Sequence, residues 1–422
     1  MSDPKRFKLL ASTDSFAALT FTAIGIVSLL VVRGALFYYI SGDYINFLGP
    51  WIEQYKTMTF WEGLGARVGN YNPPYLYILN LISRAGGSDL FYIKLVSVLF
   101  DFLLAFFVMK IVALRTESMN MHILAFLLTL AIPTVILNSS MWGQCDSIYV
   151  SLAIGSFYFG LTGRGKLAFS FMAIAVSFKL QAVFLMPVLP VLIFKNKIKL
   201  SDCYMFFVVY FVMLLPAIIA GRSVIDLLFT YFMQANYFSQ LNMNVINVWR
   251  FIGHVEYENF RLAGLYMAGI AILSLLYFTY INRTRLTNNV DFIRLAYLSS
   301  VLMPFLLPKM HDRYFLIADV LALVVFFYDK RRWYVPLITI FSSYVTYVYF
   351  LMSAVVLFDN RLVALALLIV IIIVLRDYVT SLYYGSVNTN EAITIESAGE
   401  NVSDSDDASD SDDAENDSDD AN

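Results

Sequence analysis

The chain has 422 residues, of which 59% are hydrophobic, 16% aromatic and only 14% charged, with a mean hydropathy of +0.68. This composition excludes an ordinary soluble globular domain, and many separated apolar runs predict an all-α, multi-pass membrane protein. The formal net charge of −3 is the sum of a basic membrane part and an acidic tail, because the last 22 residues contain ten acidic residues and no basic one. Without those ten, 29 basic residues face 22 acidic residues, a net charge of +7.

Two parts of the chain are therefore expected. Residues 1–384 are predicted to form the polytopic membrane domain, and residues 385–422 a disordered, acidic, cytoplasmic tail. The tail is interpreted either as a solubilising or charge-balancing segment or as a docking site for a partner. Cys145 and Cys203 are too far apart in sequence to suggest a disulfide framework or a metal site of the Cys-x-x-Cys type.

The first apolar run, 16–40, is too long for the core of a signal peptide and is not followed by a small-residue cleavage site, so it is expected to be a retained span. About twelve transmembrane helices follow from the apolar runs along the chain. Their expected bounds are 17–40, 90–114, 121–138, 146–161, 166–182, 183–194, 203–220, 262–281, 290–307, 314–328, 333–358 and 362–383.

Lysine and arginine gather at alternate ends of these spans, which the positive-inside rule assigns to the cytoplasm. The clusters are Lys5, Arg6 and Lys8; Lys110 and Arg115; Arg164 and Lys166; Lys195, Lys197 and Lys199; Arg283 and Arg285; and Lys330, Arg331 and Arg332. Both termini are then cytoplasmic in a cell membrane. The first loop, 41–89, and the long loop, 221–261, are expected on the outer face, where paired prolines and aromatic residues predict interfacial helices in the first loop.

The polar residues between spans lie almost wholly on this expected outer side. Ionisable residues near bilayer depth are costly and usually face a cavity or each other. The candidates Asp43, Asp146, Lys179, His311 and Arg313 therefore predict one polar cavity that opens outward.

Asp43 directly follows the first span, in SGDYINFLGPW. It is interpreted as an ordinary helix-end carboxylate or as a general base that deprotonates a sugar hydroxyl, with Tyr44 and Asn46 as neighbours that orient it. Asn72, in the motif NYNPPYLY of the same loop, is a further candidate for substrate binding.

In MWGQCDSIY, Gly143 permits a tight turn before the next span. Gln144 and Asp146 are candidate substrate contacts. The alternative is that Asp146 caps the following helix and Trp142 anchors it at the interface.

Lys179, in SFKLQAVFLMP, is expected inside an otherwise apolar helix, where a cation requires an anionic partner or a lipid phosphate. The alternative is that its side chain snorkels to the outer surface. Gln181 is expected to share its surroundings.

The segment PKMHDRYFL follows Pro304 and Pro308, which are expected to end the preceding helix. Arginine provides a planar fork for phosphate oxygens, and histidine adds a donor of adjustable charge. Lys309, His311 and Arg313 therefore predict a phosphate-binding group; a salt bridge of Asp312 with Arg313 and Lys309 is the alternative. A metal site is disfavoured because the chain has only three histidines.

NMNVINVWRF, in the long outer loop, combines amides with an aromatic ring. Asn247 and Trp249 are candidates for binding a sugar through hydrogen bonds and stacking. The sequence shows no glycine-rich phosphate loop, no nucleotide-binding fingerprint and no Ser-His-Asp order, so a soluble nucleotide donor has no visible site.

Taken in order, SGDY with a following PW, then NYNPPYLY, WGQCDSIY, FKLQ and MHDRYF resemble the membrane mannosyltransferases related to the second mannosyltransferase of glycosylphosphatidylinositol assembly, particularly their bacterial relatives. The resemblance covers residues 41–319 and implies a GT-C class glycosyltransferase, which takes sugars from polyprenyl-phosphate donors on the non-cytoplasmic face. It implies that Asp43 is the catalytic aspartate of the first outer loop. It also supports donor-phosphate roles for His311 and Arg313, and places for Lys179, Gln181 and Asp146 in the same site.

The resulting hypothesis is an inverting hexosyltransferase without a cofactor. Its expected partners are a polyprenyl-phosphate-linked sugar donor, a glycan or lipid-linked acceptor and membrane lipid, with no nucleic acid. A flippase or transporter of lipid-linked sugars is the alternative of another class, although the polar motifs lie on one face only. A polymerase of lipid-linked glycans shares most of the chemistry, but it would use a lipid-diphosphate donor instead of a lipid-monophosphate donor.

Overall fold

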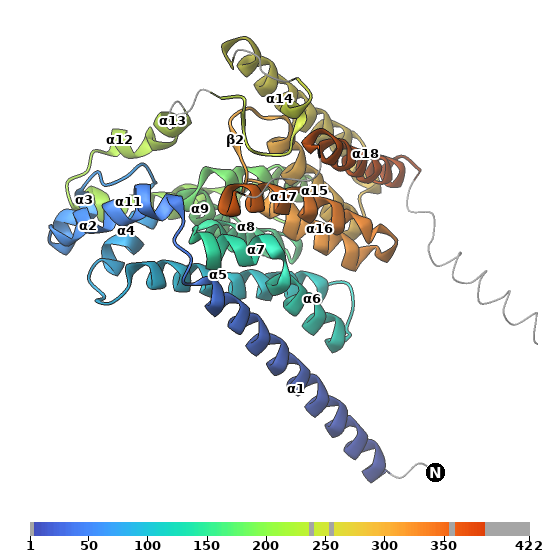
Figure 1. Cartoon of the computed structure of the whole chain (residues 1–422). Coiled ribbons are helices and arrows are strands. Elements are labelled where there is room, and N and C mark those ends of the chain that lie inside the picture. Colours follow the sequence, from blue (N-terminus) through green and yellow to red (C-terminus); the bar gives the residue numbers. More distant parts are fainter. Residues whose placement is uncertain (1–3, 236–239, 253–256, 354–358, 385–422) are drawn as a thin grey trace, which may run out of the picture.

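The computed structural model describes residues 4–235, 240–252, 257–353 and 359–384, and within these ranges the chain is almost entirely helical (Figure 1). The all-α prediction is confirmed for this part of the chain. The predicted acidic tail, 385–422, lies outside the described residues. The first helix, α1 (Pro4–Leu36), projects from the packed bundle, as Figure 1 shows.

The elements follow one another mostly through short connections. The remaining α-helices are α2 (Gly49–Lys56), α3 (Phe60–Gly65), α4 (Pro73–Ile82), α5 (Asp89–Val112), α6 (Met119–Ala131), α7 (Pro133–Ile136), α8 (Asp146–Leu161), α9 (Gly165–Phe178), α10 (Val188–Phe194), α11 (Tyr204–Ile219), α12 (Val224–Leu228), α13 (Thr230–Ala235), α14 (Tyr257–Ile281), α15 (Asn289–Leu306), α16 (Leu316–Tyr328), α17 (Tyr334–Met352) and α18 (Asn360–Tyr384). Short π and 3-10 turns are η1 (Tyr44–Leu48), η2 (Leu137–Trp142), η3 (Leu180–Leu185), η4 (Leu200–Cys203), η5 (Val248–Arg250), η6 (Arg283–Arg285) and η7 (Lys330–Arg332).

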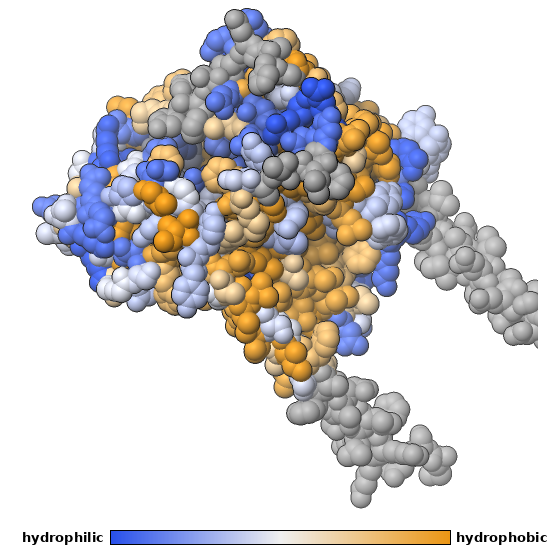
Figure 2. All heavy atoms as spheres, in the orientation of Figure 1, coloured by the Kyte–Doolittle hydropathy of each residue, from blue (hydrophilic) through white to orange (hydrophobic). Residues whose placement is uncertain are grey.

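Among the described residues, six helices are long and apolar enough to cross a membrane, or seven if the bent pair formed by α6 and α7 with η2 is one span. The six are α1, α5, α11 with η4, α14, α17 with η7, and α18. Figure 2 shows hydrophobic side chains gathered over the lower part of the molecule, where α1 leaves the bundle. These features indicate a multi-pass membrane protein.

The centre of the bundle is formed by helices too short to be counted among those six. Nearly every side chain of α8 and α16 is buried, and α8 packs along α5 and α9 while α16 packs between α15 and α17. A residue at the start of α8 is therefore enclosed by protein on several sides. This burial places Asp146, the first residue of α8, inside the molecule.

Basic residues from several of the clusters lie at helix ends that contact one another, among them Lys195, Arg285 and Arg332. The Lys195 ammonium donates to the carbonyl of Arg283 at 2.8 Å, and Arg332 pairs with Asp377 at 2.5 Å. These contacts join the loops before α11 and α15 and the ends of η7 and α18. The predicted outer motifs lie at the opposite ends of α8, α9, α15 and α16.

Proline sets two of the helix boundaries. Asn72 is extended and α4 begins at Pro73, as the paired prolines predict. The expected span 121–138 corresponds to a bent pair rather than one straight helix, because the chain bends by 52° between α6 and the segment that begins at Pro133. Proline lacks an N–H and disfavours a helical conformation at the preceding residue, and Ile132 accordingly has a ψ of 121°.

Pro304 does not end a helix as expected, since α15 continues through it to Leu306. The chain then forms strand β2 (Met310–His311), which pairs in parallel with β1 (Asn242–Met243). This short pair joins the long loop to the segment that carries Arg313.

Candidate functional site

Asp43 lies just beyond α1 and is bound to the turn that precedes α8. Its Oδ2 atom accepts hydrogen bonds from the indole Nε1 of Trp142 at 2.9 Å and from Nε2 of Gln144 at 2.6 Å. Ser41 adds a hydrogen bond from its hydroxyl to the Trp142 carbonyl at 2.8 Å. The Asp43 side chain keeps 20% exposure, so its carboxylate is oriented by protein donors and still accessible.

Gly143 makes this arrangement possible. It adopts a left-handed conformation with φ of 77°, which confirms the predicted turn. The turn is held by Ser97, whose hydroxyl donates to the Gln144 carbonyl at 2.7 Å. The side chains on either side of the glycine, Trp142 and Gln144, thereby point at the same carboxylate.

Asp146 is fully buried at the start of α8. The N-cap position belongs to Cys145 and shows no side-chain capping bond, so the interpretation of Asp146 as a helix cap is wrong. Its carboxylate instead accepts from Nδ2 of Asn138 at 2.9 Å and forms an ion pair with Lys179.

Lys179 lies at a helix break, which corrects the expected position inside a helix. Its backbone is extended, with φ of −155° and ψ of 133°; α9 ends one residue before it and η3 begins one residue after it. The ammonium lies 5.8, 5.8 and 5.9 Å from the ring centres of Tyr71, Tyr149 and Tyr314. The side chain is 8% exposed and paired with Asp146, so it does not snorkel to the surface.

Arg313 connects the carboxylates. Its Nη1 lies 3.7 Å from Oδ2 of Asp43 and 3.8 Å from Oδ1 of Asp312, while its Nε lies 3.4 Å from Oδ2 of Asp146. The guanidinium also lies over the ring of Trp142, 5.0 Å from its centre. The expected local salt bridge with Asp312 is therefore present, but it is only one part of a larger network.

His311 and Asp312 have perturbed acidities and lie outside the candidate spans. Burial, with the positive charges of Arg313 and Lys179, lowers the pKa of His311 to about 3, so the ring is neutral at physiological pH. Burial raises the pKa of Asp312 to about 7 against the opposing effect of Arg313. Lys309 adopts a left-handed conformation just before β2, and its backbone N–H donates to the Leu241 carbonyl at 3.0 Å.

These side chains form what we call the polar cluster. Its members are Asp43, Trp142, Gln144, Asp146, Lys179, His311, Asp312 and Arg313. They come from four separate parts of the sequence and meet at one end of the bundle. The two cations, Lys179 and Arg313, already face carboxylates, so an incoming anion would have to share them.

Unsatisfied polar atoms gather in and beside the polar cluster. Within the described residues, buried side-chain atoms that lack a hydrogen-bond partner include Asn72 Oδ1, Asn138 Oδ1, Tyr149 OH, Gln181 Oε1, Asp312 Oδ1 and Arg313 Nε. Buried polar groups are nearly always hydrogen-bonded, so each such group calls for an explanation. Six of these atoms belong to residues in or next to the polar cluster.

The other predicted substrate contacts near Asp43 and Lys179 are placed as follows. Tyr44 is half-buried at the start of η1, next to Asp43. Asn72 is fully buried and donates to the Ser177 carbonyl at 2.7 Å, two residues before Lys179. Asn72 therefore borders the polar cluster, whereas the Tyr44 hydroxyl lies near the charged groups of Asp89, Lys56 and Glu53 and is not brought into it.

Asn247 and Trp249 are not brought into the polar cluster. The amide of Asn247 is buried and donates to the Pro304 carbonyl at 3.3 Å. The Trp249 indole donates to the carbonyls of Leu306 and Leu307, both at 3.1 Å, and the residue is only 4% exposed. Trp249 thus presents no open face for stacking on a sugar, and both residues fix the long loop on the end of α15.

A second charged network lies beneath the polar cluster and was not singled out in the sequence. Arg33 and Asp101 are buried and paired at 3.2 Å. The Asp101 carboxylate also accepts from the hydroxyls of Ser139 at 2.6 Å and Ser147 at 2.5 Å. Ser139 lies in η2 and Ser147 directly follows Asp146, so the pair supports both arms of the turn at Gly143. Charged residues inside apolar runs were the signal that could have revealed it.

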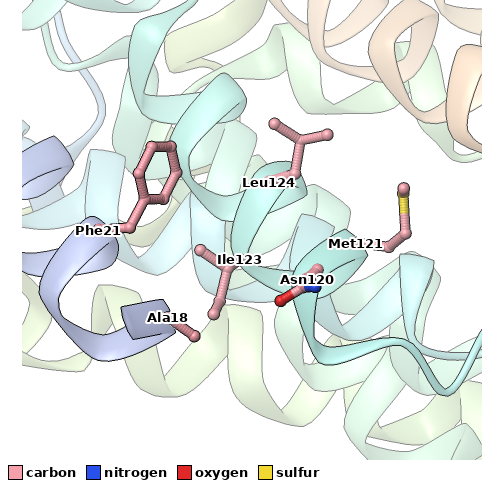
Figure 3. Close-up of a pocket in the computed structure, with 6 residues that line it drawn as sticks. All are labelled: Ala18, Phe21, Asn120, Met121, Ile123 and Leu124. Atoms are coloured by element: carbon pink, nitrogen blue, oxygen red, sulfur yellow. The ribbon is translucent and has the colours of Figure 1, made fainter. Parts of the chain in front are cut away.

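A shallow pocket of about 200 Å³ lies between α1 and α6 (Figure 3). It is lined by Ala18, Phe21, Asn120, Met121, Ile123 and Leu124. None of these residues belongs to the polar cluster, and only one has a polar side chain. The pocket therefore belongs to the apolar flank of the molecule.

Neither protein-family models nor curated proteins show a match to this chain. Its class is consequently defined by its own structure, which over the described residues is that of a mostly helical, multi-pass membrane protein. The chemistry of the polar cluster has to be inferred from its geometry.

Proposed function

We propose that this chain is an inverting glycosyltransferase of the GT-C class. It moves a hexose, mannose-like or glucose-like, from a polyprenyl-phosphate donor to a lipid-linked or cell-surface glycan acceptor. In this proposal about twelve helices cross the cell membrane, both termini are cytoplasmic and the polar cluster opens on the outer face. The proposal rests on one observation above all: a partly exposed carboxylate, Asp43, is held by two side-chain donors 3.7 Å from a guanidinium, that of Arg313.

Asp43 acts as the general base. It accepts the proton of an acceptor hydroxyl while the hydroxyl oxygen attacks the anomeric carbon of the donor. The bond from that carbon to the phosphate oxygen breaks, and its electron pair stays on the lipid phosphate. A single displacement of this kind inverts the configuration at the anomeric carbon.

The leaving phosphate needs hydrogen-bond donors and positive charge where its own charge develops. Arg313 and Lys179 supply the charge, and the carboxylates that surround them hold them in place before the phosphate arrives. His311, neutral at physiological pH, supplies a ring N–H, while Lys309 borders this group along the chain. The remaining candidates, Gln144, Asp146 and Gln181, orient these groups or the sugar.

A transporter of lipid-linked sugars is the second candidate, and one observation favours it. One helix breaks at Lys179, within the polar cluster, and another bends at Pro133, in the segment that leads to Trp142; broken helices form substrate sites in many transporters. Both breaks lie in the first half of the chain, whereas transporters with inverted repeats place them in corresponding positions of both halves.

Proteoliposomes containing synthetic polyprenyl-phosphate hexoses with a labelled sugar distinguish these candidates. The enzyme proposal predicts label in a glycan acceptor, with release of polyprenyl phosphate. Movement of intact lipid-linked sugar between leaflets, with no new glycosidic bond, would support the transporter and reject the enzyme. Transfer that requires a lipid-diphosphate donor would point to the polymerase.

A further inference from the structure

The pair of short helices α12 and α13 carries a continuous apolar stripe on one face. The side chains of the stripe are between 42% and 68% exposed. They are Val224, Ile225, Leu228, Phe229, Phe232 and Met233. Their spacing in pairs every four residues is that of one face of a helix. Exposed apolar patches of this kind mark interaction or membrane surfaces in native proteins.

The opposite face of the same segment is fixed to the protein. Leu227 is buried against Leu214 and Ala217 of α11. Thr230 is buried as well, and its hydroxyl donates to the Asp226 carbonyl at 3.0 Å. The packing of Leu227 on α11 therefore fixes the orientation of the segment and keeps the stripe on its outward face.

The stripe lies beside the end of α11. That helix is a candidate membrane span, and its outward side chains Phe207, Phe211 and Ile219 are exposed. Because α12 follows α11 closely in the chain and Leu227 packs on Leu214 and Ala217 near the end of α11, the stripe lies at the end of this candidate span. In Figure 1, α12 and α13 lie beside the end of the bundle that holds α2 and α3.

The fixed face also reaches the surroundings of the polar cluster. The Tyr231 hydroxyl donates to the carbonyl of Val176, three residues before Lys179. The Gln234 amide donates to the carbonyl of Asn70, which immediately precedes Tyr71. One face of this segment thus supports the walls of the polar cluster while the other is apolar and open.

We propose that α12 and α13 form an interfacial element whose stripe lies in the hydrocarbon of the membrane leaflet next to the polar cluster. Its partner is the acyl chains of membrane phospholipids, as expected for amphipathic helices that lie in the plane of a membrane. The inference is independent of the enzyme proposal, since it rests on burial and contacts alone.

Spin-label accessibility in phospholipid vesicles tests this directly. Single cysteines replace Ile225, Leu228 and Phe232 in a Cys203→Ser background, and the unmodified background reports any label on the buried Cys145. Collisions of the nitroxide with oxygen, which concentrates in hydrocarbon, are compared with collisions with a water-soluble nickel complex.

Two reference positions bracket the result. Phe211→Cys reports the exposed surface of the candidate span α11, and Glu117→Cys reports an exposed loop position. We expect the oxygen preference at all three stripe positions to match that at Phe211. A nickel preference like that at Glu117 would overturn the proposal. So would protection from both reagents with spin–spin broadening, which would identify a second copy of the chain as the partner. The labelled side chains replace exposed ones, and monodisperse elution of each variant verifies folding.

Discussion

Removing Asp146 from its ion pair with Lys179 is predicted to cost more free energy of unfolding than removing Lys179. Asp146→Asn removes the carboxylate that pairs with an ammonium only 8% exposed among three tyrosine rings. Breaking a buried pair by removing one partner costs about 3–5 kcal/mol, because the remaining charge is buried without compensation. We expect Asp146→Asn to lower the free energy of unfolding by an amount in that range.

Lys179→Met leaves the Asp146 carboxylate buried, but this charge keeps more partners than the Lys179 ammonium keeps in Asp146→Asn. Asp146 then still faces the guanidinium of Arg313 at 3.4 Å and the amide of Asn138 at 2.9 Å. The loss of one charged hydrogen-bond partner then costs about 1–3 kcal/mol. In the double variant the uncompensated ammonium is gone, so the combined loss should fall short of the sum by about 1–3 kcal/mol.

The assay is reversible unfolding in mixed detergent micelles, followed by tryptophan fluorescence, for the wild type, both single variants and the double variant. The exposed pair of Lys56 and Glu53 is the matched control, for which the same cycle should give a coupling below about 1 kcal/mol. Additive losses at Asp146 and Lys179 would refute the reasoning, because two residues that form a buried ion pair cannot behave independently.

Three further predictions concern neighbouring groups. Asp101→Asn should lower the free energy of unfolding by about 3–5 kcal/mol in the same assay, because it leaves its buried arginine partner unpaired. Folding lowers the pKa of His311 from 6.5 to about 3, so the contribution of His311 to the free energy of unfolding rises with pH between these values. Folding raises the pKa of Asp312 to about 7, so the contribution of Asp312 falls with pH. His311→Gln removes the rising contribution, and a pH series of unfolding curves should show its stability falling with pH between 4 and 6.5 relative to wild type. Trp142→Phe should slow sugar transfer about tenfold in initial-rate measurements, because Asp43 loses one of its two donors.

Several features of the structure follow directly from the sequence. The alternation of basic clusters along the chain predicts that the polar motifs meet at one end of the bundle, and Asp43, Gln144 and Arg313 do so. The turn at Gly143 and the start of α4 at Pro73 follow from backbone constraints specific to these two residue types. Local rules of this kind need no knowledge of tertiary packing.

Other features depend on packing between distant segments, which a single sequence does not specify. The break at Lys179 is an example: hydropathy predicts a continuous helix there, while the pairing of Lys179 with Asp146 belongs to the tertiary structure. The burial of Trp249 is another, since an amphipathic ring suits either a sugar or the end of a helix. The pairing of Arg33 with Asp101 joins α1 to α5, and neither residue indicates the other locally.

The most direct test of the proposed function compares Asp43→Asn with Glu53→Gln. Both variants replace a carboxylate by an amide in the segment between α1 and α5, but only Asp43 belongs to the polar cluster, whereas the Glu53 side chain is 69% exposed. The measurement is the initial rate of hexose transfer from a polyprenyl-phosphate donor in proteoliposomes, with equal amounts of folded protein. A general base contributes about 100-fold or more to the rate, so Asp43→Asn should lose at least that much while Glu53→Gln keeps the wild-type rate. Transfer by Asp43→Asn at the wild-type rate would contradict the assignment of Asp43 as the base.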